Sequence, residues 1–92
     1  MKTSLPTDED VQERVLEIIA SILGHPRQAV GPGSAPGVTP GWDSLAHMRI
    51  VLAVEDRFDI HISDQAVVQL LSAEAMVASV ITQLAGLDQH EG

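Results

Sequence analysis

The sequence predicts an all-α fold, a small four-helix bundle with three main helices, one short helix and a long loop between the first two. Three segments repeat apolar residues at spacings of three and four, which places those side chains on one face of a helix. No strand-length segment alternates polar and apolar residues, and residues 59–63, which come closest, are too few for a sheet. Because Trp42 and Phe58 are the only aromatic residues, the core must be mainly aliphatic.

The first helix is predicted to begin after Thr7, whose hydroxyl can cap it. Three acidic residues follow at positions 8–10 and complement the positive end of the helix dipole. Gly24 is expected to end the helix. Its apolar stripe comprises Val11, Val15, Ile18 and Ile22, widened by Leu16, Ile19 and Leu23.

Residues 24–41 contain five glycines and four prolines, which cannot sustain a helix or an interior strand. This segment is therefore predicted to be a long loop. Connections of this length in a compact domain are usually functional or poorly ordered. Either Val30 or Val38 is expected to reach the core, because they are the only branched apolar residues in the loop.

The second helix is predicted from about Ser44 to Phe58, with apolar residues in two stripes. At about 100° per residue, one stripe is a core face made of Ile50, Val51, Val54 and Phe58. The other consists of Leu45, Met48 and Leu52. This second stripe is interpreted either as a docking surface, or wall for an attached chain, or as a face covered by neighbouring helices on both sides.

The rest of the chain predicts a short third helix and a long fourth one. Ile62 should point inward, and Ser63 or Asp64 can cap a short helix carrying Val67, Leu70 and Leu71. A final helix is expected to open at Ser72 or Ala73 and to end at Gly86. Its core stripe is Met76, Val77, Val80, Ile81 and Leu84. Residues 1–92 are thus read as a single domain with its core between about 7 and 86.

Composition and charge exclude several classes of function. A chain of 92 residues has room for one small core. Thirteen acidic residues against five Lys and Arg give a net charge of −8, which disfavours nucleic acid and favours partners with basic docking surfaces. There is no cysteine, no leader-like start and no apolar run long enough to cross a bilayer, so a cytoplasmic protein without a membrane segment is expected.

The most informative side chain is the hydroxyl of Ser44 at the expected start of the second helix. Backbone N–H groups and the helix dipole favour a phosphate at this position. Asp43 can cap the helix by itself, which leaves Ser44 free of that role. His47 lies in the core-facing arc and is interpreted as a histidine hydrogen-bonded to the loop. The other histidines match no ligand spacing, so no metal site is predicted.

Several motifs, in order, resemble the acyl carrier protein family from about Val11 to Leu84. They are Leu23-Gly24, Asp43-Ser44-Leu45, the acidic segment 55–59 with Phe58, and Ile62. The resemblance implies that Ser44, flanked by Asp43 and Leu45, receives phosphopantetheine from coenzyme A through a phosphopantetheinyl transferase. The arm would hold an acyl group as a thioester for loading and processing enzymes such as a ligase, acyltransferase or ketosynthase. We expect a monomeric carrier that is not itself an enzyme. We also expect it to be free-standing, because the sequence begins at Met1 and ends just beyond the last predicted helix.

The sequence departs from this family around the serine. Trp42 precedes Asp43, and is interpreted as an apolar plug for the loop rather than a cargo-recognition residue. Ala46 and Arg49 stand where acidic residues are common, so docking is expected to use Met48 and Leu52 with Arg49, Glu55 and Asp56. Such a surface favours a secondary-metabolite or other dedicated pathway. An aminoacyl or peptidyl carrier, a carrier-like scaffold with an unmodified Ser44, and an acidic helical regulator remain as alternatives.

Overall fold

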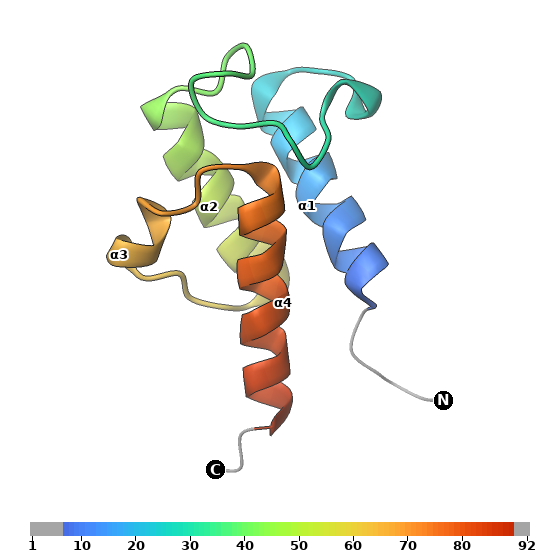
Figure 1. Ribbon diagram of the computed structural model, residues 1–92, viewed down its shortest axis with the longest axis vertical. Helices are drawn as coiled ribbons and strands as arrows, with labels where there is room; N and C mark the ends of the chain where they lie inside the picture. The colour runs from blue at the N-terminus through green and yellow to red at the C-terminus, as the bar shows by residue number, and fades with distance from the viewer. Residues whose placement is uncertain (1–6, 90–92) are drawn as a thin grey trace.

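The computed structural model describes residues 7–89, and these residues form an all-helical bundle (Figure 1). In chain order the elements are α1 (Asp8–Leu23), the 3-10 turn η1 (Arg27–Ala29), α2 (Ser44–Phe58), α3 (Asp64–Val67) and α4 (Ala73–Gln89). No strand occurs within residues 7–89. The predicted fold class, with three main helices, a short one and a long first connection, is confirmed.

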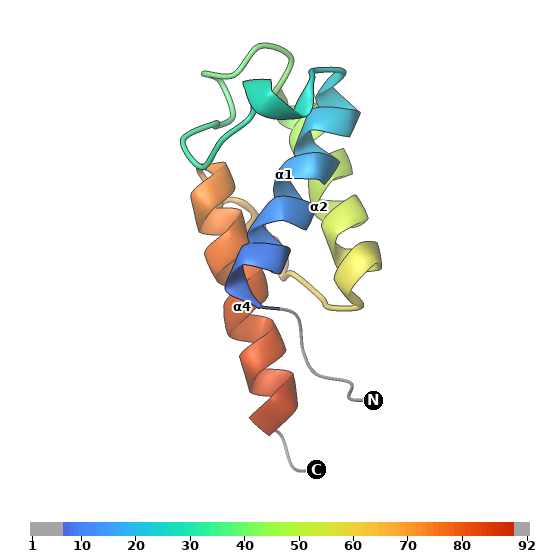
Figure 2. The same ribbon diagram turned by 90° about the vertical axis from the view of Figure 1, so that its right-hand side faces the viewer.

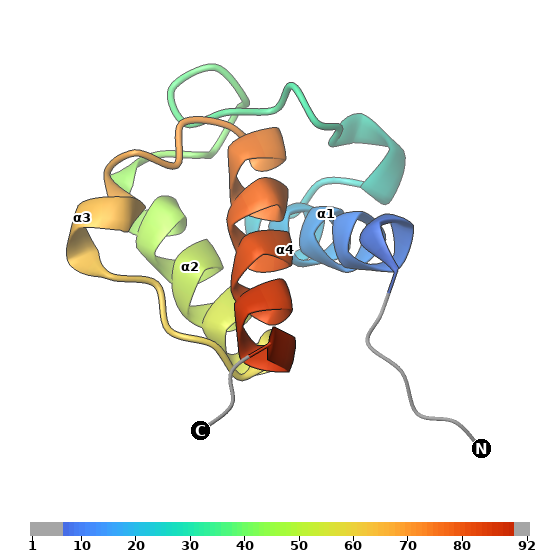
Figure 3. The ribbon, with the colours of Figure 1, turned by 60° about the horizontal axis from the view of Figure 1, so that its bottom comes forward.

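Helix α1 is the centre of the packing because it contacts both α2 and α4. Figure 2 looks onto α1, with α4 on one side of it and α2 on the other. Figure 3 shows the short α3 beside α2, on the side away from α1. The α1–α2 connection passes over the end of the bundle at which both α2 and α4 begin (Figure 1). This end therefore gathers the long loop, the start of α2 and the segment that follows α3.

The ends of α1 are set by local interactions. Thr7 Oγ1 accepts a hydrogen bond from the backbone N–H of Asp10 at 3.1 Å, and the Asp10 carboxylate accepts one from the N–H of Thr7 at 3.4 Å. This reciprocal pair satisfies two of the N–H groups that a helix start leaves unpaired. At the other end Gly24 adopts a left-handed conformation with φ of 74°, which glycine adopts without steric cost. Both predicted ends are confirmed.

The core is aliphatic apart from one tryptophan. Its most buried members come from all the main helices, and α1 presents Leu16 and Ile19 at its centre while Ile18 and Ile22 are only partly buried. The inward face of α1 is thus rotated slightly from the predicted stripe. The buried core residues are Val11, Val15, Leu16, Ile19, Ala20, Val30, Trp42, Ile50, Val51, Val54, Ile62, Val67, Leu70, Ala73, Met76, Val77 and Val80.

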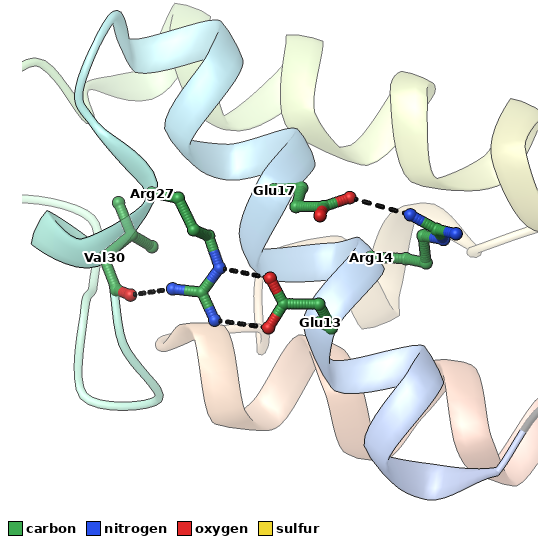
Figure 4. Close-up of polar contacts among 5 residues, drawn as sticks. All are labelled: Glu13, Arg14, Glu17, Arg27 and Val30. Atoms are coloured by element: carbon green, nitrogen blue, oxygen red, sulfur yellow. Dashed lines mark hydrogen bonds and ion pairs between the residues drawn. The ribbon is translucent and has the colours of Figure 1, made fainter.

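The loop between α1 and α2 is anchored to α1 by Arg27. The guanidinium of Arg27 makes two hydrogen bonds of 2.8 Å to the carboxylate of Glu13 and donates another of 2.7 Å to the carbonyl oxygen of Val30 (Figure 4). Val30 is buried whereas Val38 is 77% exposed, so the prediction that one of the two reaches the core is confirmed for Val30. The hydrogen bond and charge of Arg27 lower the pKa of the Glu13 carboxyl below its ordinary value of 4.5.

The same loop also caps the start of α4. The N–H groups of Ala73 and Glu74 donate to the carbonyl oxygens of Ser34 and Pro32, at 2.7 and 2.9 Å. Ser72 Oγ accepts from the N–H of Ala75 at 3.1 Å. Loop carbonyls therefore satisfy donors that the helix start would otherwise leave unpaired. The loop is part of the bundle through these bonds, and α4 opens at Ala73 as predicted.

Two predicted helix ends are wrong. Helix α3 stops at Val67, so Leu70 and Leu71 lie in the segment after it, with Leu70 buried and Leu71 68% exposed. Helix α4 continues through Gly86 to Gln89, and Gly86 does not have a positive φ. A glycine inside a helix costs only about 1 kcal/mol relative to alanine, so the helix continues where no left-handed cap forms.

Candidate functional site

Ser44 is the first residue of α2, and Asp43 caps the helix in its place. The Asp43 backbone is extended, and its Oδ1 accepts a hydrogen bond of 2.9 Å from the N–H of Ala46. Ser44 itself is exposed. The predicted division of roles is confirmed: the carboxylate of Asp43 caps the helix, and the hydroxyl of Ser44 is outside that cap.

Trp42 and His47 form the support beneath this serine. Trp42 is 2% exposed, and its indole N–H donates a hydrogen bond of 3.0 Å to Nδ1 of His47. An indole N–H is only a donor, so Nδ1 must be the acceptor and the imidazole proton lies on Nε2. Nε2 then donates to the carbonyl oxygen of Val67 at 3.1 Å. The interpretations of Trp42 as a plug and of His47 as a hydrogen-bonded core-side residue are both confirmed.

The loop before Ser44 is held by its own backbone. The N–H of Trp42 donates to the carbonyl oxygen of Thr39, and the carbonyl oxygen of Trp42 accepts from the N–H of Gly37 at 2.9 Å. Nε2 of His25 lies 2.7 Å from the carbonyl oxygen of Pro40, which joins the two ends of the loop. The loop segment that leads to Ser44 is therefore fixed both by hydrogen bonds within the loop and by the contact of Pro40 with His25.

A largely apolar groove of about 620 Å³ opens beside Ser44. One wall comes from the loop at Pro36 and Gly37, and another from the start of α2. The third wall is the segment from Val67 to Leu71, and the full lining is Pro36, Gly37, Trp42, Asp43, Ser44, His47, Met48, Val67, Val68, Leu70 and Leu71. Sequence reasoning missed Val68 as a lining residue. The sequence signal that could have indicated Val68 is its apolar side chain, which belongs to no predicted core stripe.

The second apolar stripe of α2 is exposed. Leu45, Met48 and Leu52 are 65%, 45% and 58% exposed, and no element within residues 7–89 covers them. The alternative in which neighbouring helices bury this stripe from both sides is therefore wrong for the described part of the chain. Val68 and Leu71, across the groove, are 71% and 68% exposed and extend the apolar surface.

The charged residues predicted for docking differ in their surroundings. Arg49 and Asp56 are exposed. Glu55 is turned toward the chain that follows α2: its Oε2 accepts a hydrogen bond of 2.7 Å from the N–H of Ile62 and lies 3.4 Å from Nδ1 of His61. The Glu55 side chain is only 19% exposed. Its carboxylate supports the connector between α2 and α3.

Within residues 7–89 no helix combines the length and the apolar character needed to span a bilayer. The same residues contain no group of three or more histidine and acidic side chains arranged to hold a metal ion.

Comparison with known proteins identifies the family. A family model described as "Phosphopantetheine attachment site" matches residues 13–80. An acyl carrier protein of Cyanidioschyzon merolae is 27% identical over 84 residues, which is 91% of this chain and 92% of that protein. An acyl carrier protein of Chlorobium phaeobacteroides is 24% identical over 75 residues, or 82% of this chain and 96% of that one.

The family match spans more than half of the chain and includes Ser44, its supporting residues and most of the core. The helical bundle agrees with that match. The expected prosthetic group, a covalently bound phosphopantetheine, and the expected role as a carrier rather than an enzyme follow from it. The chain belongs to the acyl carrier protein family.

Proposed function

We propose that Ser44 is the attachment residue and that this carrier presents acyl thioesters to the enzymes of a dedicated biosynthetic pathway. The observation that supports this most directly is the exposed Ser44 hydroxyl at the first position of α2, with Asp43 supplying the cap. If the Ser44 hydroxyl itself capped the helix, its modification would remove the capping hydrogen bond. Here the helix keeps its cap after Ser44 becomes a phosphodiester.

The surroundings of Ser44 fit a phosphodiester and an extended arm. A helix N-terminus favours a negative charge, and the one acid beside Ser44, Asp43, is held in the cap by the N–H of Ala46, while the first turn of α2 has no acidic side chain. The groove beside Ser44 gives apolar contact to whatever the arm carries. When attached, the arm supplies a terminal thiol that holds the acyl group as a thioester.

The side chains around Ser44 present it but do not activate it. A serine nucleophile requires a base that can take its proton. The nearby imidazole of His47 has both nitrogens engaged, by Trp42 and by the carbonyl of Val67. Ser44 therefore depends on a separate phosphopantetheinyl transferase for its modification, as the carrier role requires.

The dedicated pathway is supported by the surface beside Ser44. Apolar side chains and one arginine dominate the exposed face of the first turns of α2. Such a face suits partners matched to it rather than enzymes that recognise strongly acidic carriers. We therefore propose secondary metabolism over general fatty acid synthesis. The absence of cysteine fits a reducing compartment such as the cytoplasm.

The test is intact mass after incubation with coenzyme A and a broad-specificity phosphopantetheinyl transferase. Wild-type protein should gain one arm, and Ser44→Ala should gain none. Ser21→Ala, which removes another exposed serine near a helix end, should be modified like the wild type. A wild type that gains nothing while its helical circular dichroism is intact would favour the unmodified scaffold, and modification of Ser44→Ala would place the arm elsewhere.

The nature of the cargo is tested by the mass of the species isolated from its native host. An acyl group on the arm supports the proposed function. An amino acid or peptide on the arm would instead make the chain an aminoacyl or peptidyl carrier on the same scaffold.

A further inference from the structure

The outer face of α2 carries an ordered pattern of charge. Leu45, Arg49, Leu52 and Asp56 follow one another at spacings of four, three and four, so they form one line along the helix. All four side chains are exposed. Read away from Ser44, the line is apolar, positive, apolar and negative.

Arg49 has no partner among residues 7–89. Its neighbours at three and four positions on either side are Leu45, Ala46, Leu52 and Ala53, none of which is acidic. Of the other three described arginines, two form ion pairs and the third lies near an aromatic ring. Arg14 pairs with Glu17, Arg27 with Glu13, and the guanidinium of Arg57 lies 6.0 Å from the centre of the Phe58 ring. In a chain with 13 acidic residues, the cation nearest to Ser44 on this face is thus left unpaired.

Asp56 is the acid that remains available on the same line. Glu55, its neighbour, is occupied by the N–H of Ile62, whereas Asp56 makes no ion pair within residues 7–89. Asp56 lies seven positions after Arg49. At about 1.5 Å per residue, the two charges are displaced by about 10 Å along the helix axis.

We propose that this line docks against an enzyme surface with the complementary pattern: an apolar patch, a carboxylate facing Arg49, and a basic residue about 10 Å farther from the attachment serine, facing Asp56. This proposal rests on the proposed function of Ser44. The partner surface proposed here differs from the one expected from net charge. A uniformly basic surface would repel Arg49 close to Ser44. The carrier accordingly discriminates against such enzymes.

The test exchanges the two charges. The double variant Arg49→Asp with Asp56→Arg reverses the pattern but keeps the net charge of the protein. A matched control, Arg14→Glu with Glu17→Arg, exchanges an exposed ion pair on α1. The probes are two phosphopantetheinyl transferases of known structure, one with a uniformly basic carrier-docking surface and one with an acidic residue beside its active-site entrance. The kcat/KM for holo formation is measured with each at low and moderate salt.

The wild type should be modified more efficiently by the second transferase. The exchange should lower kcat/KM with that enzyme about fivefold and raise it with the basic enzyme by a similar factor, a size typical of exposed charge contacts. Added salt should shrink both effects. The α1 exchange should change neither rate by more than about twofold. Arg49→Gln should fall between wild type and the exchange variant.

Equal rates for wild type and the exchange variant with both transferases would overturn the proposed docking pattern while leaving the assignment of Ser44 intact. No modification of the wild type by either transferase would overturn the assignment of Ser44, and with it the docking pattern. Circular dichroism of each variant verifies that the helices are intact.

Discussion

The indole N–H of Trp42 and Nδ1 of His47 are 3.0 Å apart, and this bond joins the end of the loop to the first turns of α2. Nε2 of the same imidazole donates a hydrogen bond to the carbonyl oxygen of Val67. The loop, α2 and the end of α3 thus meet at one neutral histidine. Ser44 lies between Trp42 and His47 in the sequence, so the bond between these two side chains helps to fix the backbone that carries the hydroxyl.

The bond between Trp42 and His47 is expected to contribute measurably to stability. Trp42→Phe leaves Nδ1 of His47 without its donor and should cost about 1–3 kcal/mol, and His47→Leu should cost a similar amount. The double variant should cost less than the sum, because both single changes remove the same bond. Urea unfolding followed by far-UV circular dichroism measures the three free energies. Strict additivity would contradict a direct coupling.

The two neighbouring acids near the end of α2 should behave differently. Glu55→Ala removes the acceptor of the Ile62 N–H and should lower the free energy of unfolding by about 1–3 kcal/mol. Asp56→Ala, at an exposed position without an ion pair in the described chain, should change it by less than about 0.5 kcal/mol. Thermal or urea unfolding compares them directly. Equal losses would mean that the Glu55 contact has no structural role.

The Glu13–Arg27 pair should make stability depend on pH in the acid range. Arg27 lowers the pKa of Glu13 below 4.5 in the folded protein, so the contribution is complete above the unfolded value and is lost as the pH falls through the folded one. Glu13→Gln should therefore reduce the melting temperature at neutral pH, with the difference from wild type fading below pH 4.5. Glu17→Gln is the control and should have a smaller effect. A difference that persists in strong acid would contradict this origin.

Phe58 contributes less to the core than its aromatic side chain led us to expect. Ile50 is fully buried, whereas Phe58 is partly buried at the edge, beside the guanidinium of Arg57. Ile50→Ala should cost about 2–5 kcal/mol, and Phe58→Ala should remain below the roughly 3–5 kcal/mol of a fully buried phenylalanine. Urea unfolding of the two variants tests the order. A larger loss for Phe58→Ala than for Ile50→Ala would contradict the observed burial.

Met48 should matter for partners more than for folding. Its side chain is 45% exposed on the groove wall, so Met48→Glu should change stability by no more than about 0.5 kcal/mol. The rate of holo formation should fall, because a carboxylate then interrupts the apolar surface beside Ser44. Ala29→Glu adds the same charge at an exposed position in η1 and serves as the control. Unfolding of Met48→Glu, or an unchanged rate, would contradict a docking role.

Features governed by short-range interactions could be predicted from the sequence. Thr7, Asp43 and Ser63 cap helices through bonds to an N–H three residues away, and Gly24 needs only its own conformation to end α1. The existence of a second apolar stripe on α2 follows from helical periodicity, whereas its exposure is seen only in the folded structure. These features depend on residues that are close in the chain, so their patterns are visible without the fold.

Features that depend on distant residues were not predictable in the same way. The partner of His47 on α3 is 20 residues away, and the carbonyls that cap α4 belong to a loop about 40 residues earlier. The predicted ends of α3 and α4 were wrong at Leu71 and Gly86. Apolar pattern and glycine content describe local preference, whereas packing decides where a helix ends. The structural role of Glu55 was hidden for the same reason, since an acid after an apolar stripe looks like any surface acid.

The carbonyl oxygens of Pro32 and Ser34 that receive the first N–H groups of α4 have a practical consequence for engineering. Long irregular stretches are commonly chosen for inserting tags or fluorophores. Here, extra residues between positions 31 and 35 would displace these two carbonyl oxygens and leave the first N–H groups of α4 without their acceptors. A label on the exposed side chain of Glu9, which takes no part in the cap of α1, leaves both acceptors in place.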